Sequence, residues 1–417
     1  MNLLKTSVLN GVAVLIKTAT MFILNKVLAI YVGPAGYAAI GQFQNFIQMV
    51  TTFAGSAINT AVIKYTAEYY EDETKQRNIW KTAGSLVLIF SLIFSLIIII
   101  LQKQLSTYIF HTDAYASIFI WFAVFLTFFT FNALFLAILN GKKEVLKLVI
   151  ANITGSIFTL IITSILAIKY GLYGALVALS IYQSLAFVVT LFLCYKADWF
   201  KINYLFGKVD KDVASKFAAF ALMALVSAIC VPLSQMVIRS YITHEYGVDF
   251  AGYWEGMIRL SAAYLMLVTT TLSVYYLPKL SELSKVDDIK AEVYLGYKYI
   301  FPLAIMGGLV VYFLRDWIIA LLFSKAFLPM RDLFFWQVIG DSLKIGSWIL
   351  AYLMLSKAMT RLFIITEISF AVASIVLTYA FTQIFGFEGV SIAHLVNYGI
   401  YWVVMSIFVF KVLKNQV

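Results

Sequence analysis

Charged side chains inside otherwise apolar stretches are the residues of this sequence best suited to chemistry. Asp341 and Lys344 lie in 333–355, a stretch long and apolar enough to cross a bilayer as a helix. Lys344 is roughly 16 Å along the helix from Leu333, close to the bilayer midplane. Ionisable groups at this depth are costly unless they face a protein interior or a water-filled cavity. Their i, i+3 spacing places both on one helix face, where they can pair.

Basic side chains in other apolar stretches are candidates for binding an anion. Lys17 lies roughly 12 Å into the first stretch, which favours a role in a cavity. Lys26 follows nine residues later on the opposite helix face, and snorkelling to the outer interface explains it equally well. Arg259 carries a planar fork of donors that suits phosphate. The candidate substrate-binding residues are Lys17, Lys26, Arg259 and Lys344.

Acidic side chains in the same stretches are candidates for coupling to a proton or ion. Glu255 stands four residues before Arg259, which predicts either a self-neutralising pair or a shared substrate contact. Glu367 lies about nine ångströms into its stretch, where burial suits a carboxyl that exchanges a proton. The alternative interpretation of Glu367 is a structural bond to a neighbouring helix or to Arg361. His394 is interpreted as a packing histidine rather than a relay. The candidate coupling residues are Asp341, Glu367 and Glu255.

Other residues and motifs limit the possible mechanisms. Pro232 removes a hydrogen bond inside an apolar stretch and predicts a kink, either a static bend or a gating hinge. Cys194 and Cys230 both lie in apolar stretches, and predict neither a disulfide nor a metal site. The sequence has no G-x-x-x-x-G-K-[ST] or H-E-x-x-H motif and no nucleophile elbow with partners. We therefore expect no ATPase, no enzyme activity, no metal and no cofactor, and energy from an ion gradient, the membrane potential or the substrate gradient.

The composition indicates the elements that position these side chains. The chain of 417 residues is 62% hydrophobic and 12% charged, too little polar surface for a soluble domain. Its apolar residues fall into runs of about 20, which predicts an all-α polytopic membrane protein. The twelve predicted spans are 9–32, 37–63, 82–101, 114–140, 148–168, 174–195, 217–241, 250–277, 299–314, 333–355, 362–384 and 389–410.

The distribution of basic residues predicts the topology. With loops assigned alternately from the amino terminus, 21 of the 31 Lys and Arg residues fall on that side, which places both termini in the cytoplasm. The net charge of +10 is thereby explained by topology and by contact with anionic lipid, and not by nucleic acid. The longest external connection, 314–332, is too short for a catalytic domain, and 317–323 within it predicts an interfacial helix.

The second half of the sequence repeats the first. The turn YGLYGALVA at 170–178 recurs as FGFEGVSIA at 385–393, and the same shift of 215 places the turn at Lys142 over the turn at Lys357. Six spans per repeat is an even number, so the two lobes are expected to be parallel repeats around a central cleft. We expect an N-terminal six-helix lobe over 1–200, a cytoplasmic linker over 201–216 and a C-terminal six-helix lobe over 217–417.

Several segments resemble one known family. They are VGPAGY at 32–37, SVYYLP at 273–278, MRDLFFWQVIGDSLK at 330–344, SKA at 356–358 and TE at 366–367, together with Lys17 and Lys26. The chain resembles the Wzx-type flippases of enteric bacteria over essentially its whole length, and looks closest to their enterobacterial common antigen branch. Glu255 and Arg259 depart from that branch, which leaves the sugar open.

The resemblance implies a fold, a substrate and partners. The fold is that of the multidrug/oligosaccharidyl-lipid/polysaccharide (MOP) exporter superfamily. The implied substrate is an oligosaccharide on undecaprenyl pyrophosphate, such as an O-antigen repeat unit, moved from the cytoplasmic to the periplasmic leaflet of the inner membrane. A polysaccharide polymerase and a chain-length regulator are implied as candidate partners. The intramembrane basic residues agree with this substrate, because a pyrophosphate needs cationic groups while its prenyl tail can stay in lipid.

Two other functions remain open at this point. A MATE-like drug/cation antiporter has the same fold, but is expected to have an acidic, aromatic site, whereas the candidates here are net basic. A membrane-embedded polysaccharide polymerase or ligase needs a substantial external loop, and the longest here is short.

Overall fold

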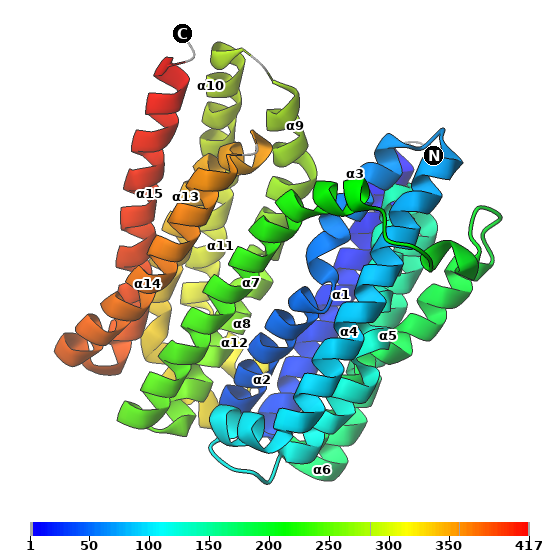
Figure 1. The fold of residues 1–417 in the computed structure, drawn as a ribbon. Helices are drawn as coiled ribbons and strands as arrows, with labels where there is room; N and C mark the ends of the chain where they lie inside the picture. The colour runs from blue at the N-terminus through cyan, green and yellow to red at the C-terminus, as the bar shows by residue number, and fades with distance from the viewer. Residues whose placement is uncertain (1–2, 284, 358, 416–417) are drawn as a thin grey trace. The chain divides into compact units, whose positions relative to one another are not determined.

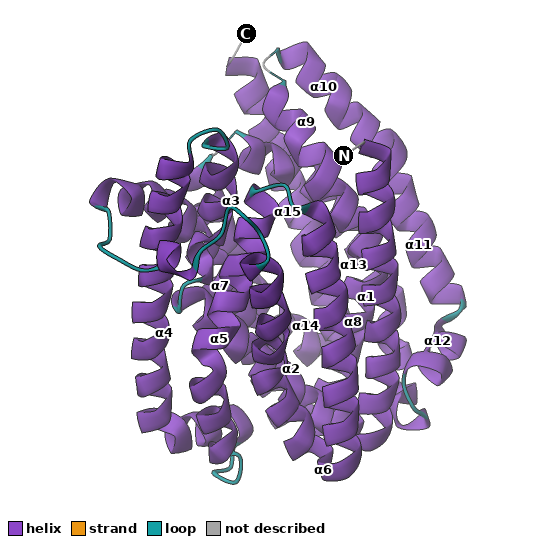
Figure 2. Cartoon of the chain, turned by 90° about the vertical axis from the view of Figure 1, so that its right-hand side faces the viewer, coloured by secondary structure: helices purple, strands orange, loops and turns teal. Residues whose placement is uncertain are grey.

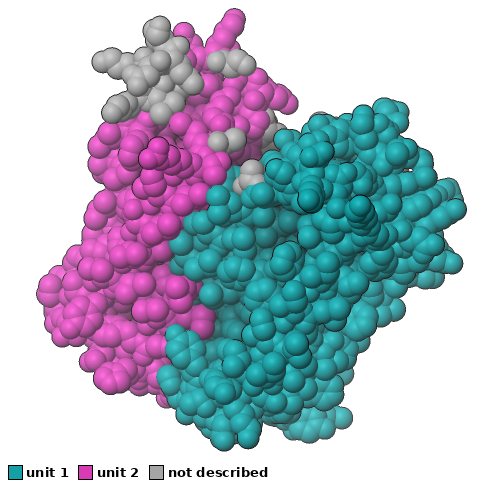
Figure 3. All heavy atoms as spheres, in the orientation of Figure 1, with its two compact units in different colours: residues 1–32, 39–232 teal, residues 33–38, 233–417 magenta. Residues whose placement is uncertain are grey.

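The computed structural model describes residues 3–415 apart from residues 284 and 358. Every regular element within these described residues is helical, as Figure 2 shows, which confirms the all-α prediction. The chain divides into two compact units, coloured separately in Figure 3. Unit 1 comprises Met1–Val32 and Ala39–Pro232, and unit 2 comprises Gly33–Ala38 and Leu233–Val417.

Unit 1 is built on long helices, drawn in Figure 1 from blue to green. Helix α5 packs against both α4 and α6, and α1 packs along α6. Serine hydroxyls join these helices, because Ser95 Oγ donates to the Ala123 carbonyl (2.7 Å) and Ser184 Oγ donates to the Phe125 carbonyl (2.8 Å). The elements are α1 (Leu3–Tyr31), α2 (Gly33–Phe53, of which 33–38 belong to unit 2), η1 (Ser56–Ile58), α3 (Asn59–Glu68), α4 (Glu73–Phe110), α5 (Ala116–Gly141), α6 (Val145–Tyr195), η2 (Ile202–Leu205) and α7 (Lys211–Tyr246, up to Pro232).

Unit 2 is built around α13, which packs against α15, α11 and α8. Its core gathers apolar side chains of these helices, with Tyr276, Ile345 and Ile349 fully buried among them. Besides 33–38 and the end of α7, its elements are α8 (Val248–Thr271), η3 (Leu272–Tyr276), α9 (Leu277–Glu282), α10 (Val286–Leu295), η4 (Gly296–Ile300), α11 (Phe301–Phe313), α12 (Arg315–Leu322), η5 (Lys325–Leu333), α13 (Phe334–Ser356), α14 (Thr360–Phe385), η6 (Gly386–Glu388) and α15 (Gly389–Asn415).

The helices are those of a multi-pass membrane protein. By length and composition the described residues hold eight candidate spans, or nine if the bent pair α2–α3 counts as one. Two of the eight, Val145–Tyr195 and Thr360–Val409, have 51 and 50 residues, more than twice the length that one crossing needs. Each changes direction at a glycine with positive φ, Gly171 or Gly386, so each accommodates two of the twelve predicted spans.

The backbone supports the predicted internal repeat. Glu144 before α6 has φ −78° and ψ 62°, and Met359 before α14 has φ −78° and ψ 61°. The amide of each donates to the carbonyl five residues earlier. Gly171 (φ 57°, ψ −136°) and Gly386 (φ 64°, ψ −149°) also match. Both pairs are separated by 215 residues, so the sequence shift found at these turns corresponds to the same turn conformations.

Two predicted boundaries differ from the structure. The span 37–63 is broken, because α2 and the η1–α3 segment meet at an angle of 68° near Gly55, whose φ is 135°. The span 82–101 continues to Phe110 in α4, because the polar segment 102–104 (Gln-Lys-Gln) favours helix, and the helix ends at His111 in the left-handed region. The predicted interfacial helix at 317–323 coincides with α12.

The segment 201–216 packs within unit 1. Leu205 is fully buried, and a Cβ added at Gly84 of α4 would lie 2.2 Å from the Leu205 carbonyl oxygen, so only glycine permits this contact. Ser85 Oγ also donates to the Gly207 carbonyl (2.9 Å). The division between the compact units falls at Pro232 inside α7, 16 residues beyond the end of the predicted linker. The lobe boundaries inferred from the sequence stay a prediction.

Candidate functional site

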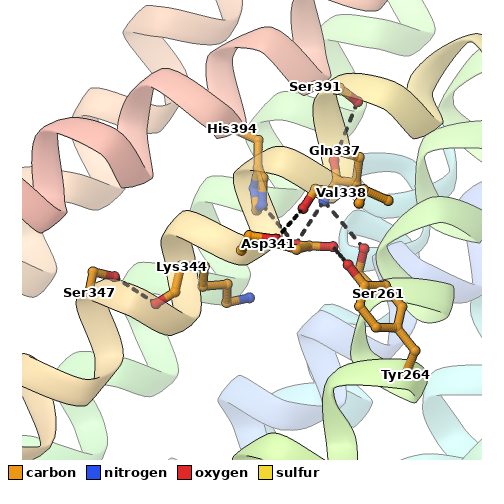
Figure 4. A network of polar contacts seen from close by, with 10 residues as sticks. Ser261, Tyr264, Gln337, Val338, Asp341, Lys344, Ser347, Ser391 and His394 are labelled. Carbon is orange, nitrogen blue, oxygen red and sulfur yellow. Dashed lines mark hydrogen bonds and ion pairs between the residues drawn. The ribbon is translucent and has the colours of Figure 1, made fainter. Parts of the chain in front are cut away.

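Helix α13 presents a polar row to the interior of unit 2. Gln337 and Asp341 are four residues apart and lie on one face, and both are buried. Helix α15 approaches this face closely because position 340 is glycine: a Cβ at Gly340 would lie 2.5 Å from His394 Cδ2. The approach places His394 against α13, as Figure 4 shows.

The Asp341 carboxylate accepts hydrogen bonds on both oxygens. Tyr264 Oη of α8 donates to Oδ2 (2.6 Å), and Gln337 Nε2 donates to Oδ1 (3.3 Å). His394 Nε2 of α15 lies 2.9 Å from Oδ1. Only 1% of the Asp341 side chain is exposed, and a carboxylate buried to this degree requires such partners. Figure 4 shows these partners converging on it from three helices.

Lys344 is not in contact with Asp341, although their spacing predicts that the two side chains pair. Among the described residues, no Asp341–Lys344 contact falls within 4 Å, because donors of α8, α13 and α15 already surround the carboxylate. The half-buried Lys344 Nζ instead lies 4.9 Å from the ring centroid of Trp348 and 5.3 Å from that of Tyr398. An ammonium group that lies against two aromatic faces and has no acidic contact is available to bind an anionic group of a ligand.

Glu255 forms a second charged cluster in unit 2. Arg239 Nη2 donates to its Oε2 (2.5 Å) and Arg259 Nε donates to its Oε1 (2.7 Å). Glu255 and Arg239 are buried, with side chains 6% and 3% exposed. The Arg259 guanidinium also lies 5.3 Å from the ring centroid of Tyr37, and that of Arg239 5.4 Å from Trp254. The structure thus contains the Glu255–Arg259 pair that the spacing predicted, within a larger cluster.

The other candidate residues lie on α1, α14 and α7. Lys17 is exposed on α1, and Lys26 is half-buried on the same helix. Glu367 is half-buried on α14, near Tyr401, and no hydrogen bond or ion pair of its carboxyl, including the alternative with Arg361, occurs among the described residues. Pro232 is buried inside α7, at the division between the compact units.

Sequence reasoning missed two partners and underrated a third. Arg239 lies near the end of a predicted span, and Tyr264 lies among many apolar and aromatic residues. The sequence favours a packing role for His394, whereas in the structure its Nε2 contacts Asp341. A buried carboxylate needs several donors, so Asp341 itself implied such partners, but not their positions. Within the described residues, no group of three His, Cys, Asp or Glu side chains suits a metal ion.

The fold defines a class of membrane transporter. An inward-facing multidrug resistance MATE family transporter of the MOP superfamily superposes with a TM-score of 0.75, at 16% identity over 95% of this chain and 96% of that one. The lipid II flippase MurJ in an inward closed conformation superposes with a TM-score of 0.74, at 17% identity over 98% of this chain and 87% of that one. The chain therefore has the fold of the MOP transporters, as expected.

The family follows from the sequence match. Residues 3–284 match the family described as "Polysaccharide biosynthesis protein", and the chain belongs to this family. The chain is also 29% identical to the "Lipid III flippase" of Escherichia coli (strain K12), over 96% of this chain and 97% of that protein.

Proposed function

We propose that the protein moves an undecaprenyl-pyrophosphate-linked oligosaccharide, such as an O-antigen repeat unit, across the bacterial inner membrane. The relative named lipid III flippase matches almost end to end, and the fold is shared with a lipid II flippase. In this proposal the cargo enters from the cytoplasmic leaflet and leaves in the periplasmic one by alternating access, driven by a proton or ion gradient. Both termini lie in the cytoplasm, as the distribution of basic residues predicts.

The observation that carries the proposal is the environment of Lys344. Its ammonium group is half-buried in a membrane-spanning helix and has no acidic contact within the described residues. A cation at this depth that Asp341 attracts without direct contact is costly, so an anionic ligand is the simplest reason to keep it. A pyrophosphate supplies that anion, and the rings of Trp348 and Tyr398 offer apolar faces beside it.

The remaining candidates receive proposed roles in the same cycle. Lys17 and Lys26 assist the pyrophosphate during its passage, Pro232 acts as the hinge, and Glu367 contributes to coupling. The carboxylate of Glu255 neutralises much of the positive charge of Arg259. We therefore propose that these two residues affect cargo binding and coupling mainly through the shape and field of unit 2.

Transport by the purified protein tests this proposal. The full chain is reconstituted into vesicles, and a prenyl-pyrophosphate-linked oligosaccharide is added to one leaflet. Its arrival in the other leaflet is measured by accessibility to an impermeant sugar-modifying enzyme. We expect transfer above that of protein-free vesicles, and accumulation of a lipid-linked oligosaccharide, identified by mass spectrometry, in cells lacking the protein. Absence of transfer by folded protein contradicts the proposal.

The same vesicles distinguish the alternative suggested by the MATE neighbour. Export of a small cationic dye without transfer of the glycolipid identifies a drug/cation antiporter. Formation of new glycosidic bonds identifies a polymerase or ligase. We expect neither activity.

A further inference from the structure

We propose that His394 carries the proton of the transport cycle at its Nδ1 atom, and that Asp341 positions its ring. In this proposal the charge of the imidazole sets the net charge of the anion site at Lys344. The inference rests on the proposed function and assigns the coupling step to a residue other than the three acids considered above.

The hydrogen-bond pattern makes Asp341 an acceptor. Ser391 Oγ donates to Gln337 Oε1 (3.3 Å), so the Gln337 amide is oriented with its nitrogen towards Asp341. Tyr264 Oη donates to the other carboxylate oxygen. A proton that exchanges with solvent would have to reach a side chain that is 1% exposed. Asp341 is therefore a poor site for rapid proton exchange.

The same pattern leaves one ring nitrogen of His394 able to accept a proton. Because Asp341 Oδ1 is an acceptor, His394 Nε2 carries hydrogen and donates to it. The lone pair of the neutral ring then lies on Nδ1, which forms no hydrogen bond among the described residues. The His394 side chain is 22% exposed, far more than Asp341. Imidazole is also the side chain that ordinarily changes charge between about pH 5 and 8.

Tyr398 connects His394 with Lys344. The His394 and Tyr398 rings have centroids 4.8 Å apart, and Lys344 Nζ lies 5.3 Å from the Tyr398 centroid. Asp341, neutral His394 and Lys344 together carry no net charge, and protonation of His394 raises this to +1. At about 10 Å and an effective dielectric constant of about 20, one added charge changes the affinity for a monoanion on the order of tenfold.

The ionisable groups near His394 lie on several helices, including η6, which packs on α15 and carries Glu388 six residues before His394. Helix α13 contributes Asp341 and Lys344, α8 contributes Tyr264 through Asp341, and α15 itself contributes Tyr398. Helix α14 also packs on α15, and its acid Glu367 lies near Tyr401, about two turns from His394. Of these groups, only Asp341 is hydrogen-bonded to the imidazole among the described residues.

The test measures how pH changes the binding of a prenyl pyrophosphate. The purified full chain in detergent is titrated with farnesyl pyrophosphate at pH 5.5 and 7.5, at fixed sodium and ionic strength. We expect the wild type to bind about tenfold more tightly at pH 5.5. His394→Gln keeps an amide donor for Asp341 but cannot titrate, so its ratio between the two pH values falls to about one. His244→Gln, at an exposed histidine, keeps the tenfold ratio and controls for the removal of a histidine elsewhere in the chain.

Asp341→Asn distinguishes the two possible proton carriers. If His394 carries the proton, this variant keeps a pH response, because the imidazole is unchanged. A lost response in Asp341→Asn together with a normal response in His394→Gln would overturn the proposal. The proposal would also be overturned if binding by the wild type changed with sodium concentration at fixed pH and did not change with pH. Wild-type protein that binds no prenyl pyrophosphate at either pH refutes the proposed function itself.

Discussion

Unit 2 holds two charged clusters that satisfy their charges in different ways. In the first, Arg239 and Arg259 both bind Glu255, and aromatic rings cover the two guanidinium groups. In the second, Asp341 receives neutral donors and a histidine, while Lys344 lies against rings without an acidic contact within the described residues. The first cluster consists of groups with fixed charge. The second contains a histidine, to which we assign the proton of the cycle, and a lysine, to which we assign the anionic ligand.

The difference teaches that a charge within a membrane span is not evidence of function by itself. Glu255 and Arg259 neutralise each other in part, and with Arg239 they form a compact structural element. Lys344 has no direct ion pair among the described residues, so its presence in a membrane span needs another explanation. We therefore expect substitutions in the first cluster to affect mainly stability, and those in the second to affect mainly transport.

The largest expected effect is the loss of stability on neutralising Glu255. Glu255→Gln leaves the buried Arg239 and the half-buried Arg259 without their carboxylate, which costs about 3–5 kcal/mol and lowers the unfolding temperature of the purified protein. Adding Arg239→Met removes one of the two arginines that lost the Glu255 carboxylate and should recover part of the loss. The view that this cluster is structural would be contradicted by Glu255→Gln protein with unchanged thermal stability and no transport.

Removing one donor from Asp341 should have a smaller effect. Tyr264→Phe removes the hydrogen bond to Oδ2 (2.6 Å), and a lost bond to a buried charged group costs about 1.5–3 kcal/mol. Transport should fall as well, because Asp341 and His394 lose a fixed geometry. Tyr253→Phe, at a buried tyrosine of the same helix, is the control. Equal unfolding temperatures of the two variants would show that the Tyr264 hydroxyl does not support the network.

The packing of α15 on α13 should respond to a single methyl group. Gly340→Ala places a Cβ 2.5 Å from His394 Cδ2 and 3.0 Å from the Leu395 backbone, an overpacking that costs about 1–3 kcal/mol. At Gly307 of α11 the nearest atom would be 3.9 Å away, so Gly307→Ala should be neutral or stabilising, by up to about 1 kcal/mol. Thermal unfolding of both variants measures the contrast. A Gly340→Ala protein as stable as Gly307→Ala would mean that α13 and α15 are less closely packed.

Single-helix features of the site could be predicted from the sequence. The depth of Asp341 and Lys344 and the i, i+4 pair of Glu255 and Arg259 need only helix geometry. The internal repeat could also be predicted from the sequence, because turns need glycine where φ is positive, as at Gly171. These features depend on residues that are close in the sequence or on a repeated pattern.

Contacts between helices could not be predicted in the same way. The Asp341–His394 contact joins residues 53 positions apart, and the Arg239–Glu255 contact depends on how α7 packs on α8. Each depends on helix rotation, and the Asp341–His394 contact depends also on the close approach that Gly340 permits. Many helix rotations satisfy the same hydropathy pattern. The sequence therefore identified the acids and bases without identifying the correct partner for Asp341.

The most direct test of the account is transport by protein altered at Lys344. Lys344→Ala, Lys344→Arg and, as a control, Lys298→Ala, at an exposed lysine beside Tyr299, are reconstituted in equal folded amounts. Transfer of the prenyl-pyrophosphate-linked oligosaccharide is then measured. The account predicts that Lys344→Ala abolishes transfer, that Lys344→Arg retains part of it and that Lys298→Ala transports normally. Full transfer by Lys344→Ala would contradict the central claim that this cation binds the pyrophosphate.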